Sequence, residues 1–407
     1  MTVAPQRRAL IVGGSMAGLM AGCLLLRRGW DVQIFERVAG PLAGRGAGIV
    51  THDVLRRVLV GCGVDAGENL GIPVELRRCF ASDGRIVAEH RFPQLVTAWE
   101  HLFTLLRAAF PASRYHAGQA LASLAQDEVG VRLRLADGGE VEGDILIGAD
   151  GIRSMVRAAL LPEATPAYAD YIAWRGLSAE ADFPADLRAE VFPHFTFDLP
   201  WGEQVLGYPV AGSGNDLRAG HRRYNTVWYR PADAASDLPQ LLTDATGRQH
   251  EHSIPPPLIA PATIAAMRAD AQRLLSPQFA VVMGLAPNPF LQPIYDLESP
   301  RMTVGRVALI GDAAFVARPH VGAGVSKAAE DALALVQALV KEVDVTQALA
   351  RFEEQRLPLN RHIVERARYL GRCIASGGHL PDTSVAEPAA MLRDTATLDF
   401  LRVPPAA

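Results

Sequence analysis

The sequence predicts an α/β protein of two domains, one doubly wound on a parallel sheet and a second α+β domain built on an antiparallel sheet. Short, unbroken apolar runs at residues 9–12, 145–147 and 307–310 have the pattern of strands buried on both faces of a parallel sheet. Between residues 168 and 230 the pattern changes to short β-type runs rich in aromatic residues, which favours an antiparallel sheet. A chain of 407 residues is also long enough for two cores.

Composition excludes several classes of protein. The chain is 49% hydrophobic and 21% charged with a formal net charge of −4, so it is an ordinary globular sequence with no attraction to nucleic acid or to membranes. Every long apolar run is interrupted before it could span a bilayer. The cysteines show no paired spacing, so neither a disulfide framework nor a metal site is expected, and free thiols fit a cytoplasmic protein. They are Cys23, Cys62, Cys79 and Cys373.

The first sixty residues carry the signature of a Rossmann-type βαβ unit that binds a dinucleotide. A strand at 9–12 leads through a glycine-rich turn into a helix that extends to about Arg28, and a second strand follows at 31–36. In such units the pyrophosphate lies at the helix N-terminus, where free N–H groups and the helix dipole favour an anion. We therefore expect the whole turn to contact the cofactor: Gly13, Gly14, Ser15, Met16, Ala17 and Gly18.

The residues that end the second strand extend this predicted site. Glu36 stands 18 residues beyond Gly18, which suits it to accept hydrogen bonds from an adenosine ribose, and Arg37 follows it in the predicted contact set. Ser15 replaces the second glycine of the G-x-G-x-x-G pattern, but its hydroxyl could itself bond a phosphate oxygen. On its own, the motif is also compatible with a Rossmann-like domain that binds no nucleotide.

Two later segments turn this weak signal into a specific one. Residues 144–151 form a buried strand ending in Gly-Ala-Asp-Gly, and residues 307–314 form another that ends in Gly-Asp-Ala-Ala. The second is followed by Pro319, Gly322 and Gly324. The three segments in this order resemble the class A flavoprotein monooxygenases of the para-hydroxybenzoate hydroxylase type, and the resemblance covers nearly the whole chain.

The resemblance implies a Rossmann-type FAD-binding domain and non-covalently bound FAD. It implies that Asp312 bonds the ribityl chain and that a helix beginning near Gly324 points its N-terminus at the flavin. Asp150 is expected in the cleft, although it could also cap the helix that begins near Ser154. The remaining cofactor contacts implied are Arg45, Gly46, Leu106, Pro319, Gly322, Ala323 and Val325.

The chain departs from the family pattern at Ser15, where the family has glycine, and at Phe315, where it commonly has a histidine. It also has Trp99 where the family often has an arginine, and this departure points to a sub-branch. The run from Gly311 to His320 resembles the 2,6-dihydroxypyridine 3-monooxygenase branch particularly closely. The resemblance therefore implies a hydroxylated N-heteroaromatic substrate such as 2,6-dihydroxypyridine.

The family chemistry implies the other participants. NADH or NADPH reduces FAD, dioxygen then forms a flavin C4a-hydroperoxide, and an electron-rich ring attacks its distal oxygen. No second Rossmann fingerprint is present, so the nicotinamide is expected to bind transiently, and the chain could form a homodimer. Hydroxylation of another phenol or an oxidised purine, and a flavin reductase or oxidase of the same fold, remain alternatives. A regulatory protein that binds the nucleotide without using it in catalysis is disfavoured, because an adenosine site alone would not need residues 311–325.

A general base with a pKa near neutrality would make a ring hydroxyl more nucleophilic, which favours histidine. His52, which follows the glycine segment, is the first candidate. Tyr208 and His194 come next, with His221 and Tyr229 behind them. A lone histidine is more often structural. No metal is needed, because the cofactor carries the chemistry.

The pattern along the chain divides it into four parts. Residues 1–165 and 266–350 are predicted to form the FAD-binding domain, and residues 166–265 the substrate domain. Residues 351–407 are predicted to form a C-terminal helical region.

Overall fold

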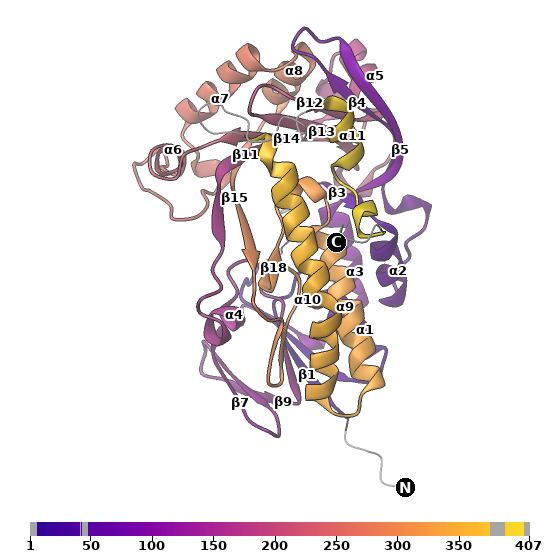
Figure 1. Cartoon of the computed structure of the whole chain (residues 1–407), viewed down its shortest axis with the longest axis vertical. Helices are drawn as coiled ribbons and strands as arrows, with labels where there is room; N and C mark the ends of the chain where they lie inside the picture. The colour runs from indigo at the N-terminus through magenta and orange to yellow at the C-terminus, as the bar shows by residue number, and fades with distance from the viewer. Residues whose placement is uncertain (1–5, 41, 43–47, 375–386, 403–407) are drawn as a thin grey trace, which may run out of the picture.

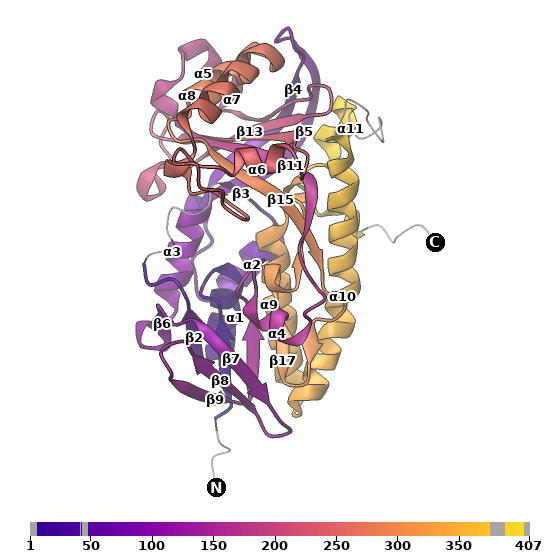
Figure 2. The same cartoon turned by 90° about the vertical axis from the view of Figure 1, so that its left-hand side faces the viewer.

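Two large sheets organise the chain. The computed structural model describes residues 6–40, 42, 48–374 and 387–402, and every structural statement below refers to these residues. A six-stranded sheet lies in the lower half of Figures 1 and 2, and a nine-stranded sheet lies in the upper half. The long helix α10 (Val345–Leu370) runs beside both halves. The predicted α/β fold class is confirmed.

The smaller sheet is the predicted parallel one. Its strand order is β16-β17-β10-β1-β2-β6, and all its neighbours are parallel except β16 and β17. Its central strands are unbroken apolar runs because both of their faces are covered. The strands are β1 (Arg8–Val12), β2 (Asp31–Glu36), β6 (Tyr115–Ala117), β10 (Ile145–Gly148), β16 (Thr303–Val304) and β17 (Val307–Leu309).

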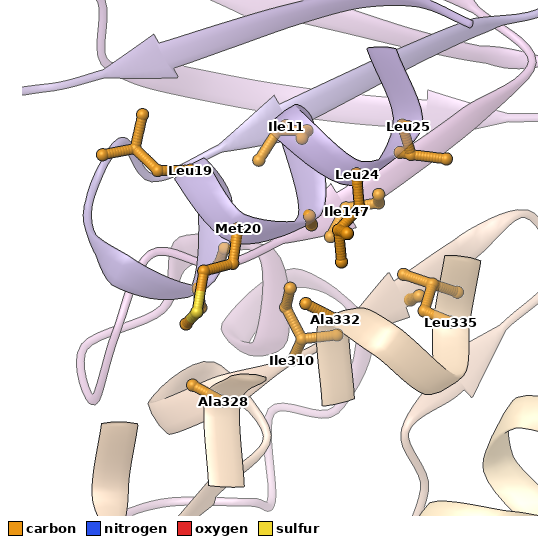
Figure 3. Close-up of a cluster of buried hydrophobic side chains, with 14 of the residues drawn as sticks. Ile11, Leu19, Met20, Leu24, Leu25, Ile147, Ile310, Ala328, Ala332 and Leu335 are labelled. Atoms are coloured by element: carbon orange, nitrogen blue, oxygen red, sulfur yellow. The ribbon is translucent and has the colours of Figure 1, made fainter. Parts of the chain in front are cut away.

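Helices α1 (Met16–Leu26) and α9 (Gly324–Lys341) join the first and third predicted segments. Figure 3 shows Met20 of α1 directed towards Ile310, which follows β17, and towards Ala328 of α9, and all three side chains are buried. Two segments some three hundred residues apart in sequence therefore share one core. Helix α3 (Trp99–Ala109) also packs against α1.

The larger sheet is antiparallel apart from one parallel pair, β4 with β12. Its order is β18-β15-β11-β14-β13-β12-β4-β5-β3. The strands are β3 (Gly48–Thr51), β4 (Ile72–Phe80), β5 (Ile86–Ala98), β11 (Ala167–Ala179), β12 (His194–Asp198), β13 (Gln204–Val210), β14 (Arg223–Pro231), β15 (Phe290–Glu298) and β18 (Phe315–Val316).

Strand alternation gives this sheet two different faces. On β11, Tyr171 and Ala173 belong to one buried cluster, whereas Ile172 and Trp174 belong to another. The second cluster packs beneath helices α5 (Ala185–Val191), α7 (Pro261–Leu274) and α8 (Pro277–Leu285). The first cluster is aromatic and includes Tyr229, so this is the face on which a pocket for a ring can form.

The division between sheets does not follow the predicted boundary at residue 165. Strands β3, β4 and β5 fall within residues 1–165, yet they belong to the larger sheet, because β4 pairs with β12. Within the aromatic-rich region, α5 extends to Val191 and β12 begins at His194.

The remaining elements are small. A three-stranded sheet contains β7 (Leu121–Gln126), β8 (Val131–Leu135) and β9 (Glu140–Gly143). The other helices are α2 (Asp53–Gly61), α4 (Met155–Leu160), α6 (Asp237–Leu241) and α11 (Pro388–Asp394). Within the described ranges, no helix has the length and apolarity needed to cross a bilayer.

Candidate cofactor and substrate site

The first glycine turn is built for close backbone contact. Gly13 has φ +107°, and a Cβ there would lie 2.3 Å from the carbonyl oxygen of Ala149, while a Cβ on Gly18 would lie 1.9 Å from the carbonyl oxygen of Gly13. No side chain caps the N-terminus of α1 at Ser15, and its first turn holds no acidic residue. The helix therefore presents free N–H groups to an anion.

A cavity of about 280 Å³ opens beside this turn. Five of the predicted cofactor contacts line it: Gly13, Ser15, Glu36, Arg37 and Asp150. The Glu36 carboxylate is buried and accepts hydrogen bonds from the N–H of Gly14 (2.8 Å) and the N–H of Val38 (2.9 Å). A carboxylate at the end of β2 can accept a hydrogen bond from a ribose hydroxyl here, which is the role that the sequence predicts for it.

Other predicted contacts support this cavity without lining it. Met16, Ala17 and Leu106 are buried in the core, and the carbonyl oxygen of Gly14 accepts a hydrogen bond from the Tyr115 hydroxyl at 3.0 Å. Gly18 makes the close approach to Gly13. The resemblance implies a cofactor contact at Leu106, and the structure places that side chain in the core. Arg45 and Gly46 lie outside the described residues.

Asp150 occupies both of the positions that the sequence left open for it, in the cleft and at the start of a helix. The residue lines the cavity, and its carboxylate accepts hydrogen bonds from the Ser154 hydroxyl (2.5 Å) and the N–H of Met155 (2.7 Å) at the start of α4. Burial raises the pKa of this carboxyl group, and these hydrogen bonds oppose the rise. Asp150 therefore caps a short helix at the edge of the cavity.

A second cavity, of about 470 Å³, lies between the two sheets and is called here the main cavity. Trp99, the residue that departs from the family pattern, lines both cavities, so the two adjoin. One side of the main cavity, the loop wall, contains the predicted residues Asp312, Pro319, Gly322, Ala323, Gly324 and Val325. The opposite side, the sheet wall, contains Arg175, Phe195, Leu206, Tyr208, Val227 and Tyr229.

A buried ionic network anchors the loop wall. Gly311, with φ +59°, donates its N–H to Asp331 Oδ2 at 3.0 Å. Asp331 Oδ1 accepts hydrogen bonds from Arg356 Nε (2.9 Å) and Asn360 Nδ2 (3.0 Å), and Lys327 Nζ lies 3.7 Å from Asp331 Oδ2. Burial raises the pKa of Asp331, but the charges of Arg356 and Lys327 outweigh it and hold that pKa low. Helices α9 and α10 thus hold the turn that precedes Asp312.

The loop wall presents one carboxylate and one helix N-terminus. The Asp312 side chain is exposed to the cavity although protein surrounds it, and this burial raises its pKa, with Lys327 opposing and Asp331 adding to the rise. Helix α9 begins at Gly324 with no side-chain cap and no acidic residue in its first turn. Its N–H groups can therefore stabilise negative charge in the cavity.

The sheet wall supplies buried phenols. The Tyr208 hydroxyl donates to the carbonyl oxygen of Gly48 at 3.0 Å, and burial raises its pKa to about 12. Burial also raises the pKa of Tyr229, and in both cases the Arg175 charge acts in the opposite direction. Both side chains stay protonated near neutrality, so they can form hydrogen bonds but are poorly suited to accept a proton.

His320 joins the two walls, and sequence reasoning missed it. Its Nε2 lies 2.8 Å from the Tyr171 hydroxyl and its Nδ1 lies 2.8 Å from Gln204 Oε1. Because Gln204 Oε1 can only accept, Nδ1 carries the proton and Nε2 accepts from Tyr171. Burial lowers the pKa of His320 to about 3, and its ring centroid lies 4.4 Å from that of Tyr229. His320 is therefore neutral and both of its nitrogens are engaged.

The predicted histidines lie outside the main cavity. His52 lines a neighbouring cavity that shares Val50 with the main cavity, with Nδ1 2.9 Å from Ser326 Oγ, and burial lowers its pKa to about 4. His194 begins β12, where its Nδ1 is buried without a partner. His221 is exposed, 3.7 Å from Asp216. Of the predicted base candidates, only Tyr208 and Tyr229 face the loop wall.

The comparisons with known proteins agree with this architecture. A family model described as "FAD binding domain" matches residues 6–190 and 297–367, and one described as "FAD binding domain-like" matches residues 168–296. The chain belongs to this FAD-binding family of class A flavin monooxygenases. It is an FAD-dependent monooxygenase, and NAD(P)H is the co-substrate typical of the family.

Three particular relatives are informative. The chain is 32% identical over 376 residues to 2,6-dihydroxypyridine 3-monooxygenase of Paenarthrobacter nicotinovorans, covering 91% of this chain and 92% of the relative. The solved structure of 2,6-dihydroxypyridine-3-hydroxylase from Arthrobacter nicotinovorans superposes with a TM-score of 0.86 at 30% identity, covering 94% and 96%. Klebsiella pneumoniae HpxO, solved with FAD and uric acid, shares the fold at 23% identity and a TM-score of 0.73, covering 94% and 91%.

The residues present fit FAD. The uncapped N-terminus of α1 suits a pyrophosphate, and Glu36 suits a ribose. Asp312 and the uncapped N-terminus of α9 face the adjoining main cavity. The site therefore offers polar partners for the nucleotide end and the ring end of one extended cofactor.

Proposed function

We propose that this enzyme hydroxylates a hydroxylated N-heteroaromatic ring, such as 2,6-dihydroxypyridine, with NAD(P)H and dioxygen. The observation that carries the proposal is a single cavity with the predicted flavin-contacting loop on one side and an aromatic sheet surface on the other. The similarity to 2,6-dihydroxypyridine 3-monooxygenase over nearly the full length of both chains supports the substrate class.

The reaction requires one oxygen atom to enter the ring and the other to leave as water. NAD(P)H supplies two electrons, a ring C–H bond becomes C–OH, and bound FAD supplies the electron transfer and oxygen activation. The residues of this chain position the ring and exclude water. Phe195, Leu206 and Val227 give the sheet wall its apolar surface, and the Tyr229 hydroxyl can form a hydrogen bond with a ring oxygen. The Tyr208 hydroxyl already donates to Gly48, so it can accept a hydrogen bond from a ring hydroxyl.

The sheet wall holds phenols and no free imidazole among its described residues. Tyr208 and Tyr229 have raised pKa values, and both nitrogens of His320 are already engaged. Because His52 lies in another cavity, we do not assign it the role of base. Activation of a ring hydroxyl in this site therefore depends on stabilising its anion rather than on a neutral histidine that takes the proton.

Turnover under ¹⁸O₂ tests the proposed function. The purified holoenzyme is supplied with NADH or NADPH and, separately, with 2,6-dihydroxypyridine, 6-hydroxynicotinate, 3-amino-4-hydroxybenzoate and uric acid. We expect ¹⁸O in the product of a hydroxypyridine, with close to one product formed per NAD(P)H oxidised. NAD(P)H oxidation that yields only hydrogen peroxide with every ring would contradict the proposal and favour a reductase or oxidase.

A tyrosine variant adds a site-specific readout. Tyr208→Phe removes a cavity hydroxyl, so we expect a lower ratio of product to NAD(P)H, with a fall in kcat/KM of about 5- to 30-fold for one lost hydrogen bond. Tyr168→Phe is the matched control, because its hydroxyl donates to the carbonyl oxygen of Ala232 and lies outside the main cavity. Equal ratios in the two variants would remove Tyr208 from the substrate site.

A further inference from the structure

Arg175 is an unpaired cation in an otherwise aromatic surface. It lies on β11 and faces the main cavity, as expected from its alternation with Tyr171 and Ala173. Its Nε is buried and has no hydrogen-bond partner, and no described carboxylate lies within 4.0 Å of its guanidinium. A buried, unpaired donor on a charged group is costly, so it calls for a ligand.

The other arginine of the same cavity is neutralised. Arg318 Nε lies 2.7 Å from Asp296 Oδ2, and Arg368 Nη2 lies 2.8 Å from the other oxygen of that carboxylate. Arg318 therefore has an ion-pair partner, in a cluster on the loop side of the main cavity. Of the two cavity arginines, only Arg175 retains an unbalanced charge.

The positive charge of Arg175 acts on the tyrosine side chains that line the main cavity. Its charge acts to lower the pKa of both Tyr208 and Tyr229, although burial keeps both phenols protonated. A guanidinium offers a planar fork of donors that matches an anionic oxygen. The same field would favour loss of a proton from a ring hydroxyl bound beside it.

We propose that Arg175 binds an anionic oxygen on the ring substrate and so selects rings that can carry one. This inference rests on the proposed function and adds a class of substrate to it. The anion can be a deprotonated ring hydroxyl, whose proton leaves to solvent on binding, or a ring carboxylate. In the first case Arg175 makes the ring more electron-rich before oxygen transfer and takes the place of a general base.

Ligand binding to the FAD-loaded protein without NAD(P)H tests this assignment apart from turnover. The probes are 2,6-dihydroxypyridine, 6-hydroxynicotinate and the uncharged control nicotinamide, an amide whose ring carries neither a hydroxyl group nor a carboxylate. For Arg175→Gln we expect the affinity for an anionic ring to fall about 10- to 100-fold, the range for a lost charge-assisted hydrogen bond, and affinity for the amide to change much less. Arg175→Lys should restore part of the affinity, because it keeps the charge but not the fork.

Calorimetry in two buffers of different ionisation enthalpy separates the two sources of the anion. Proton release on binding 2,6-dihydroxypyridine that disappears in Arg175→Gln assigns the site to a ring hydroxylate. Loss confined to 6-hydroxynicotinate assigns it to a carboxylate. Arg218→Gln is the control for net charge, since Arg218 is exposed in the same half of the molecule and pairs with Asp216.

Three results would overturn the assignment. They are a parent protein that binds the anionic rings no better than the amide, an equal loss for all three probes in Arg175→Gln, and a parallel loss of FAD affinity in that variant. Because binding is measured without turnover, a failure to hydroxylate any ring would count against the proposed function alone.

Discussion

The two walls of the main cavity differ in which part of the chain forms them, main chain in one and side chains in the other. The loop wall is mostly backbone: Gly322, Gly324 and the turn at Gly311 bring the main chain to the surface, and Asp331 holds that turn from behind. The sheet wall is made of side chains, with Arg175 and Tyr229 projecting from neighbouring strands. The loop wall therefore presents peptide groups in a fixed conformation, and the sheet wall presents side chains from alternate positions along its strands.

This difference explains what each wall can recognise. A backbone cradle suits the part of a ligand that does not vary, such as a cofactor, because glycine spacing determines its shape. A side-chain surface can be altered one residue at a time without moving the strands. We therefore expect substrate selectivity to depend on the sheet wall, and binding of the ring end of the cofactor to depend on the loop wall.

The largest effect is expected where the loop wall is anchored. Asp331→Asn removes the charge shared by Arg356 and Lys327 in a fully buried site, so we expect a loss of about 3–5 kcal/mol in the free energy of unfolding. FAD affinity should fall as well, because Gly311 loses its charged acceptor. Chemical denaturation and FAD titration measure the two effects. The exposed Asp83→Asn control should have little effect, and equal losses in both variants would show that the network is not an anchor.

A smaller effect separates cofactor binding from ring binding. Asp312→Ala removes the cavity carboxylate of the loop wall, and we expect FAD binding to weaken by about 1–3 kcal/mol, the cost of a lost charged acceptor. Asp312→Asn should weaken it less, because one acceptor oxygen remains. Fluorescence titration with FAD gives both values. Parental FAD affinity in Asp312→Ala would place the cofactor elsewhere.

The smallest expected effect is a change of stability with pH, and it concerns His320, the residue that joins the two walls. Burial lowers its folded pKa to about 3, whereas an unfolded histidine titrates at about 6.5, so the unfolded chain binds more protons between these values. Stability is therefore full above pH 6.5 and declines as the pH falls towards 3. Between pH 7 and 5.5 this contributes a loss of about 1 kcal/mol.

Two variants isolate that contribution. His320→Gln should show a shallower decline in the free energy of unfolding over this pH range than the parent, whatever its absolute stability. The exposed His221→Gln should keep the parental slope. An unchanged slope in His320→Gln would mean that this ring titrates in the folded protein as it does in the unfolded chain, so that burial does not lower its pKa.

The sequence indicated the glycine turns and strand ends more clearly than the sheet wall. Gly13, Glu36 and Asp312 could be singled out because glycines and strand ends leave a pattern in the sequence. The Leu106 side chain is buried in the core, because a helix periodicity gives the spacing of a face but not the neighbour that covers it. His52 was chosen for its nearness in sequence to the glycine segment, but α2 begins there and carries it to another cavity.

Two residues of the main cavity were missed, Arg175 on strand β11 and His320 in the turn at residues 319–321. Arg175 follows Tyr171 and Ala173 at alternate positions, and that single charge on an apolar face was the available signal. His320 gave no comparable signal, because its partners Tyr171 and Gln204 come from distant strands. The assignment of β4 and β5 to the larger sheet likewise depends on a long-range pairing with β12.

The most direct test is the crystal structure of the protein with FAD and 2,6-dihydroxypyridine bound. The account predicts one FAD that extends from Glu36 to the N-terminus of α9, with the pyridine ring between it and the sheet wall. A ring oxygen should lie within about 3.2 Å of the Arg175 guanidinium, the range of a hydrogen bond. A ring bound outside the main cavity, or held there with Arg175 still unpaired, would contradict the division between the two walls.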